Sequence, residues 1–241
     1  MSELDLYARV EDLLGFGEAK KRLYSIFFDE IKSLNLIYGD ILDFGCGSGE
    51  FLLELSEKFA TGFMGRNGDT WRGFRGIDAS EEMVARTLAN GMPASTRGLD
   101  DYIDEFALIT ATFDVINYLN LYELKQFFDD ALHALVRGGY LMFDINTLKG
   151  FSLADGVLHE TDGQNHIIID ANFDQNVLTT QMIYFEKSGV NYIKHQNAIK
   201  QYYHSAKEIL NLSPLTHIKT RAINLYENGD KEILVFQKSP K

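Results

Sequence analysis

The sequence predicts an α/β fold in which a mostly parallel β-sheet carries helices on both faces. Strand-like and helix-like segments alternate through roughly the first 145 residues, which is the pattern of consecutive β-α-β units. A short apolar run ends in three glycines at alternate positions, Gly45, Gly47 and Gly49, and a helical pattern follows directly. After residue 150 the β-rich runs follow one another, which indicates an antiparallel insertion.

The first elements are expected within residues 1–78. Residues 1–35 form an N-terminal helical segment, with an apolar stripe at helical spacing between residues 6 and 34. The first strand covers residues 41–44, and the helix after the glycine turn begins near Phe51. A loop with four glycines, residues 61–75, leads to a second strand at 74–78. This loop is longer than most such connections, so we expect it to be mobile or to cover a site.

Capping signals delimit the next helix. Ser80 is a favourable N-cap and is followed by Glu81 and Glu82, while Gly91 and Pro93 mark the end. A third strand is predicted near residues 94–97, and a fourth at 106–111. Leucines and Phe128 then recur at helical spacing from residue 121 to residue 135, and the segment 137–139 is expected to close that helix. The fifth strand, residues 140–145, is nearly all apolar, as a central parallel strand should be.

The second half is predicted to be mainly antiparallel. An insertion over residues 151–204 contains β-rich runs at 166–171, 177–186 and 192–203, separated by turn signals. A helix is expected at residues 205–212. The final runs, 216–226 and 232–237, flank Asn228 and Gly229, and Asn-Gly between two β-rich runs is a strong hairpin signal. No linker divides the chain, so residues 1–241 are expected to form a single domain.

Composition narrows the function classes. The chain of 241 residues has a formal net charge of -12, which disfavours nucleic acid as a partner. Its single cysteine, Cys46, excludes an intrachain disulfide framework. The N-terminus lacks the features of a signal peptide, and no apolar run reaches membrane-spanning length. We therefore expect a cytoplasmic protein that does not associate with membranes.

The glycine turn has the chemistry of a ligand site. Free backbone N–H groups at a helix N-terminus, together with the helix dipole, can hold an anionic or polar ligand. In the dinucleotide pattern G-x-G-x-x-G the third glycine stands one position later than Gly49 does here. This spacing favours a nucleoside ligand such as S-adenosylmethionine over NAD or FAD. Cys46, inside the turn, is interpreted as a small residue tolerated in a crowded position and not as a nucleophile.

Several motifs in order resemble the class I S-adenosylmethionine-dependent methyltransferases, over most of the chain. Residues 42–49, LDFGCGSG, resemble that family's L-D-x-G-C-G-x-G, and residues 76–80, GIDAS, resemble its G-x-D-x-S. Residues 137–139, RGG, resemble its K-P-G-G turn but lack the proline. The resemblance implies a seven-stranded, Rossmann-like sheet with a terminal antiparallel hairpin. It also implies S-adenosylmethionine as the cofactor and S-adenosylhomocysteine as the product.

A second group of motifs resembles a subset of small bacterial methyltransferases, several of which act on amino groups of sugars or other metabolites. Residues 113–119, FDVINYL, resemble the subset's F-D-S-L-N-Y-L. Residues 144–147, DINT, resemble its F-D-I-N-T, and residues 201–203, QYY, resemble its Q-R-Y-Y. These motifs indicate a lineage and leave the methyl acceptor open.

The resemblance implies roles for particular residues. The glycines would let the backbone approach the methionine part of the cofactor, Asp78 would bind the ribose, and Asp100 or Asp101 would receive the adenine amino group. The implied cofactor-binding positions are Asp43, Gly45, Cys46, Gly47, Gly49, Asp78, Ala79, Asp100, Asp101, Ala111 and Thr112. The candidates for binding the acceptor are Asn117, Tyr118, His195 and Tyr203. No catalytic residue is assigned, although Asp114 and Asp144 are among the candidates for a base.

The leading hypothesis is transfer of a methyl group to nitrogen or oxygen of a small metabolite, with residues 151–204 as a lid over the acceptor. A protein or RNA acceptor, a cofactor-binding regulator without turnover and, more distantly, a dinucleotide oxidoreductase are the alternatives. No metal site is expected, because the six histidines show no paired spacing with acids or cysteine. The oligomeric state is left open.

Overall fold

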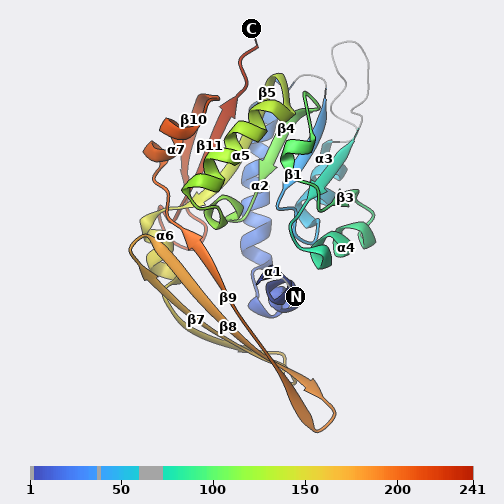
Figure 1. Cartoon of the computed structure of the whole chain (residues 1–241), viewed down its shortest axis with the longest axis vertical. Coiled ribbons are helices and arrows are strands. Elements are labelled where there is room, and N and C mark those ends of the chain that lie inside the picture. Colours follow the sequence, from blue (N-terminus) through green and yellow to red (C-terminus); the bar gives the residue numbers. More distant parts are fainter. Residues whose placement is uncertain (1–2, 37–38, 60–72, 241) are drawn as a thin grey trace.

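A seven-stranded sheet forms the centre of the molecule (Figure 1). The computed structural model describes residues 3–36, 39–59 and 73–240. In spatial order the strands are β10 (Thr216–Ile223), β11 (Lys231–Gln237), β5 (Leu135–Asn146), β4 (Phe106–Ala111), β1 (Asp40–Phe44), β2 (Phe74–Ile77) and β3 (Ala94–Ser95). Strands β1 to β5 run parallel, and β11 is antiparallel to both of its neighbours. The predicted mostly parallel sheet with a closing antiparallel hairpin is confirmed.

Helices cover both faces of this sheet because alternate residues of the central strands point in opposite directions. Ile109 of β4 packs in the same cluster as α5 (Leu121–Ala134) and α7 (Ala206–Leu212). Its neighbour Leu108 belongs to a second cluster, with α2 (Gly17–Ser33) and α3 (Glu50–Phe59). Every residue of β4 is buried. The apolar runs of the central strands therefore supply two cores, one on each face.

The N-terminal helical segment is divided into three elements. These are α1 (Glu3–Val10), a 3-10 helix η1 (Glu11–Leu14) and α2. The chain turns between η1 and α2 at Gly15, which has a φ of +69°, a conformation that glycine adopts without steric cost. The prediction of one helical stretch over residues 6–34 was wrong at this turn. The glycine-rich loop that we expect to be mobile or to cover a site lies, from residue 61 to residue 72, outside the described residues.

The capping predictions agree with the observed helices. The Ser80 side chain accepts a hydrogen bond from the Met83 N–H at the start of α4 (Glu81–Ala89). At α5 the prediction erred at the C-terminal end, because the helix stops at Ala134 and residues 137–139 belong to β5. The register between β4 and β5 shifts there, and the Gly138 N–H donates to the Lys238 carbonyl. The two glycines therefore form an irregularity inside a strand instead of a helix end.

A four-stranded antiparallel sheet follows α6 (Leu148–Ala154). Its strands are, in order, β6 (Gly156–Thr161), β7 (His166–Asp174), β8 (Val177–Ser188) and β9 (Asn191–Tyr202). The predicted antiparallel insertion is confirmed, but β6 and α6 were missed. Most of β6 is exposed, and within the described parts of the chain the strand pairs only with β7. An exposed edge strand needs no alternation of apolar and polar residues, so its sequence carried no strand signal.

One face of the four-stranded sheet packs against the N-terminal elements. Leu6, Val10 and Leu14 share an apolar cluster with residues of β7, β8 and β9, among them Ile167 and Met182. The sheet is thereby joined to α1 and η1. In the part of the chain that the structure describes, no helix is long and apolar enough to cross a membrane.

Replacing Phe128 with Ala is expected to lower the free energy of unfolding by about 3–5 kcal/mol. Phe128 lies on α5, is fully buried, and its ring centroid is 6.0 Å from that of Phe143 and 5.9 Å from that of Phe236. Urea denaturation measures the change. Tyr122→Ala on the same helix is the matched control: this side chain is 78% exposed, and we expect a change within about 0.5 kcal/mol. Equal losses in the two variants would contradict the assignment of this core.

Candidate functional site

A cavity of about 390 Å³ opens where β1, β2 and β4 end. Ligands of open α/β sheets bind at this edge, because the segments that leave parallel strands meet there. The lining comes from the glycine turn, the ends of the strands and the N-terminal helices. It consists of Tyr7, Glu11, Lys20, Tyr24, Phe44, Gly45, Cys46, Gly47, Ser48, Phe51, Ile77, Asp78, Ala79, Met83, Thr96, Arg97, Gly98, Thr112, Phe113, Val115, Tyr118 and Leu119.

The glycine turn is fastened to the end of β2 by backbone hydrogen bonds. The N–H groups of Gly45 and Cys46 donate to the Ile77 carbonyl at 2.8 and 3.0 Å. Gly45 has a φ of +70°, and a Cβ there would lie 2.5 Å from a methyl group of Val115. Gly47 also has a positive φ, of +54°, but nothing lies within 4 Å of where its Cβ would be. Gly45 is therefore required by packing, whereas Gly47 leaves its backbone open beside the cavity.

Asp78 stands at the end of β2 with its carboxylate held by two backbone donors. The Gly47 N–H donates to Oδ2 and the Ser80 N–H donates to Oδ1, each at 2.9 Å. Burial raises the pKa of Asp78, and the two N–H groups oppose that rise. A carboxylate has about four acceptor positions, so both oxygens can still accept hydrogen bonds from a ligand in the cavity.

Asp43 is a buried carboxylate beside the same cavity. Its Oδ1 accepts a hydrogen bond from the Thr110 hydroxyl at 2.8 Å, while its Oδ2 has no hydrogen-bond partner among the described residues. Burial raises the pKa of Asp43 to about 7. Its charge contributes to raising the pKa of two cavity-lining residues, Tyr24 and Cys46. A buried carboxylate oxygen without a partner favours a donor or a cation nearby.

The N-terminal helices form one wall of the cavity, which the sequence did not predict. Tyr7 of α1, Glu11 of η1, and Lys20 and Tyr24 of α2 all line the cavity. The Lys20 ammonium lies 2.5 Å from Glu11 Oε1 and 3.1 Å from Oε2 of Glu50, the residue that follows the glycine turn. No motif marks these residues. The apolar stripe predicted only that the helices pack against something, and not which polar residues would face a cavity.

The predicted site residues fall into two groups. Those that line the cavity are Gly45, Cys46, Gly47, Asp78, Ala79, Thr112 and Tyr118. Outside the lining lie Asp43, Gly49, Asp100, Asp101, Ala111, Asn117, His195 and Tyr203. Asp100 and Asp101 are exposed on a 3-10 helix, η2 (Leu99–Asp101). After β3 the cavity is lined instead by Thr96, Arg97 and Gly98.

Cys46 has the environment of a structural residue. Its side chain is buried, and its sulfur lies 3.7 Å from the Thr87 hydroxyl oxygen. A Cβ on Gly76 would lie 2.5 Å from this sulfur, so Gly76 makes room for it. Burial raises the pKa of the thiol to about 12, which leaves almost no thiolate at neutral pH.

The residues considered for the acceptor are separated in space. Tyr118, on the 3-10 helix η3 (Val115–Tyr118), lines the cavity, and burial raises its pKa to about 12. His195 lies on β9 with its Nε2 3.0 Å from Glu186 Oε2. Tyr203 packs edge-on against Phe151. Among the described residues, none from the insertion at 151–204 lines the cavity; the insertion packs on α1 and η1, which do.

No protein-family model matches the sequence, and no curated protein matches it. Solved structures do resemble it. An S-adenosylmethionine-dependent methyltransferase from Clostridium acetobutylicum matches with a TM-score of 0.73 at 18% identity, over 91% of this chain and 92% of the other. The sugar N-methyltransferase KedS8 from Streptoalloteichus gives 0.69 at 16% identity, over 98% and 92%.

CalS10, an amino pentose methyltransferase from Micromonospora echinaspora solved with S-adenosylmethionine bound, gives a TM-score of 0.65 at 14% identity over 97% of both chains. At these identities the likeness concerns the fold. The chain has the Rossmann-like fold of these methyltransferases, including the antiparallel β11 between β5 and β10.

Replacing Asp43 with Asn is expected to stabilise the cofactor-free protein more at pH 8 than at pH 5. Burial raises the pKa of Asp43 from 3.8 to about 7. Between these values the folded protein keeps a proton that the unfolded chain releases, so stability falls as the pH rises. The variant lacks this titration, and its advantage over the wild type should grow by about 1–3 kcal/mol between the two pH values.

Urea denaturation of both proteins at pH 5 and pH 8 measures this change. Asp170→Asn, at an exposed position of β7, controls for the removal of one carboxylate. A difference between Asp43→Asn and the wild type that stays constant across the pH range would contradict the raised pKa.

Proposed function

We propose that this protein is an S-adenosylmethionine-dependent methyltransferase that methylates nitrogen or oxygen of a small metabolite. The observation that carries the proposal is the cavity lined by the glycine turn and by Asp78, at the ligand-binding edge of a methyltransferase fold. Its volume of about 390 Å³ is within the usual range for small-molecule sites, roughly 300–1,000 Å³.

The residues around the cavity fit the parts of this cofactor. Asp78 offers its remaining acceptor positions to the ribose hydroxyls. Lys20 is bonded to Glu50 beside the glycine turn, so we assign its ammonium to the methionine carboxylate. Asp43 lies outside the lining, but its buried Oδ2, which has no hydrogen-bond partner among the described residues, would favour a positive charge at the same end of the cofactor. Met83 of α4 and residues 96–98, which follow β3, line the cavity, and we assign the adenine to these residues in place of Asp100 or Asp101.

The sulfonium of the bound cofactor would supply an activated methyl group, and the protein would supply alignment and a site shielded from water. The aromatic residues of the cavity serve the second purpose. Tyr24 and Phe51 are buried in its lining, and Phe113 and Tyr118 are half-buried there. A protein base is needed only when the accepting atom arrives protonated.

A small acceptor is favoured by two observations. The sugar N-methyltransferase KedS8 and the amino pentose methyltransferase CalS10 match this chain along nearly its whole length. Within the cavity, Glu11 and Tyr118 place a carboxylate and a hydroxyl in the wall, and both groups can bind an amine. We therefore favour an amine among the small acceptors.

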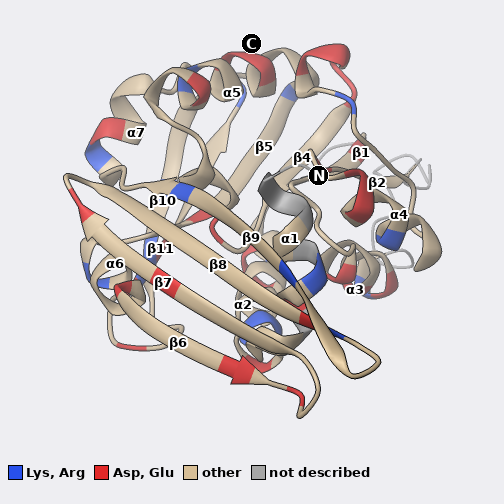
Figure 2. Cartoon of the chain, turned by 60° about the horizontal axis from the view of Figure 1, so that its bottom comes forward, with Lys and Arg blue, Asp and Glu red and all other residues tan. Residues whose placement is uncertain are grey.

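The alternative functions make different demands on the protein surface, on the ligand and on catalytic turnover. An RNA acceptor needs a basic patch, whereas the Lys and Arg positions coloured along the ribbon in Figure 2 are spread over many elements among those of Asp and Glu. A regulator would bind the cofactor without transferring the methyl group. An oxidoreductase would bind NAD.

Isothermal titration calorimetry with S-adenosylmethionine, S-adenosylhomocysteine and NAD tests the proposal. We expect the first two to bind in a 1:1 ratio and NAD not to bind. Transfer of a radiolabelled methyl group to a panel of amino sugars, other small amines and alcohols then tests turnover. If neither S-adenosylmethionine nor S-adenosylhomocysteine binds, the proposal is wrong. Binding without methyl transfer to any acceptor would favour the alternative of a regulator that binds the cofactor without turnover.

Replacing Asp78 with Ala is expected to weaken S-adenosylhomocysteine binding by about 1–3 kcal/mol, because two hydrogen bonds to a charged group are lost. Titration calorimetry measures the dissociation constant. Asp170→Ala removes an exposed carboxylate from β7 and should leave the affinity unchanged. An Asp78→Ala protein that is folded and binds as tightly as the wild type would contradict the role given to Asp78.

A further inference from the structure

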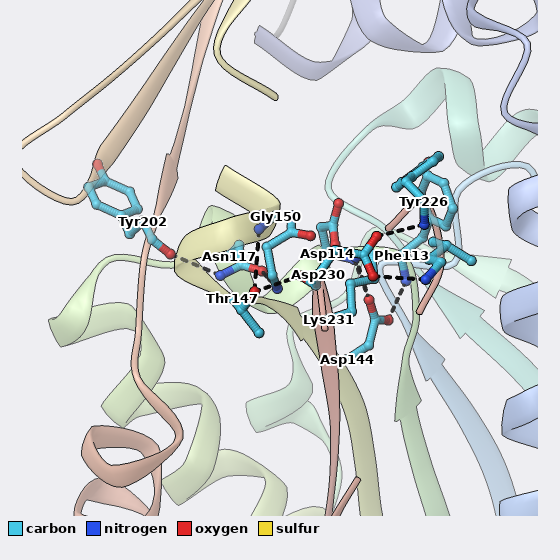
Figure 3. Close-up of polar contacts among 12 residues, drawn as sticks. Phe113, Asp114, Asn117, Asp144, Thr147, Gly150, Tyr202, Tyr226, Asp230 and Lys231 are labelled. Carbon is cyan, nitrogen blue, oxygen red and sulfur yellow. Dashed lines mark hydrogen bonds and ion pairs between the residues drawn. The ribbon is translucent and has the colours of Figure 1, made fainter. Parts of the chain in front are cut away.

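The segment after β4 begins with an unusual backbone. Phe113 and Asp114 have φ values of +65° and +71°, and two successive residues with a side chain rarely adopt this left-handed conformation. Neither residue is glycine, so the turn is not favoured by its own sequence. The surrounding structure must hold it. Figure 3 shows the polar contacts that converge there.

Asp144, on β5, binds the backbone of this turn. Its Oδ1 accepts a hydrogen bond from the Phe113 N–H at 2.7 Å, and its Oδ2 accepts from the Asp114 N–H at 3.4 Å. The side chain of Asp144 is fully buried. A buried carboxylate needs a compensating cation as well as donors.

Lys231 of β11 provides that cation. Its Nζ lies 2.8 Å from Asp144 Oδ2 and is also hydrogen-bonded to Asp114 Oδ1. Lys231 is only 1% exposed, so these two carboxylates take the place of water as hydrogen-bond partners of its ammonium. Lys231 therefore links the side chain of Asp114, which belongs to the turn, to the carboxylate of Asp144, which binds the backbone of the turn.

A second buried contact fixes the other end of the segment. The amide of Asn117, itself fully buried, accepts a hydrogen bond from the Asn146 N–H and donates one to the Tyr202 carbonyl, both at 2.9 Å. Asp144 and Asn146 both belong to the end of β5. Residues 112–119 are thus held to the sheet at both ends, and Figure 3 shows the two anchors side by side.

We propose that Lys231 is a positioning residue of the cofactor site, acting through Asp114 and Asp144. Five residues of the held segment line the cavity: Thr112, Phe113, Val115, Tyr118 and Leu119. Lys231 does not line it. Val115 also packs where a side chain on Gly45 would stand, so a displaced segment would disturb the glycine turn as well. This inference rests on the proposed function, because it takes the cavity to be the cofactor site.

The test compares Lys231→Met, Lys231→Arg and Lys125→Met by titration with S-adenosylhomocysteine. Lys231→Met keeps most of the side-chain volume but leaves Asp114 and Asp144 without their cation, and we expect affinity to fall about tenfold or more. Lys231→Arg keeps the charge and should retain most of the affinity. Lys125→Met is the matched control, because Lys125 is exposed on α5 and forms an ion pair with Asp129 on the same helix.

A purely structural lysine would lower the melting temperature and leave the affinity of the folded protein unchanged. Folded Lys231→Met protein with the affinity of the wild type would therefore overturn the proposal. The double variant Lys231→Met with Asp114→Gly adds a rescue. Glycine accepts a positive φ and removes one uncompensated carboxylate, so part of the lost affinity should return.

Hydrogen exchange of the wild-type protein keeps the proposal testable if Lys231→Met does not fold. The amides of Phe113 and Asp114 should be protected by Asp144; exchange at the rate of unprotected amides would refute the role of the buried cluster. Failure of the proposed function is recognised separately, because then the wild type itself would not bind S-adenosylhomocysteine.

Discussion

Three backbone N–H groups of the turn after β1 donate to the end of β2, and the whole site depends on them. Gly45 and Cys46 bind the Ile77 carbonyl, and Gly47 binds the Asp78 carboxylate. The carboxyl ends of parallel strands lie at the same edge of the sheet, but the loops that follow these strands can fold over that edge and cover it. Here the turn is tied to the adjacent strand, so Asp78 and the open backbone of Gly47 face the same cavity.

The other walls of the cavity come from distant parts of the chain. The N-terminal helices contribute Glu11 and Lys20, and the segment after β4 contributes a wall that Lys231 of the last strand holds from outside the lining. The four-stranded sheet contributes no described residue to the lining, yet it packs on α1 and η1. Its place in the molecule is behind the N-terminal wall, where it supports the residues that do line the cavity.

The sequence was informative wherever a local rule applies. Apolar runs identified the central strands because both of their faces are buried. Asn228 and Gly229 marked the place of the final hairpin, although its strands are joined by the longer loop 224–230 and not by a two-residue turn. The rules failed at β6, which is an exposed edge strand, and at Gly138, where a helix-ending signal lies within a strand. In both places the conformation is decided by strand pairing with another segment, and this pairing cannot be predicted from the order of apolar and polar residues within the segment itself.

By itself, the sequence determined the class of fold, the position of the glycine turn and the presence of Asp78 at the end of the second strand. These depend on backbone conformation and on alternation of side chains within short segments. Only the tertiary structure decided that Lys20 faces the cavity, that Asp100 and Asp101 do not, and that Lys231 holds the turn at Phe113. Such contacts join residues far apart in the chain. Their energy comes from desolvation and pairing of charges, which depend on where the folded chain brings those charges together.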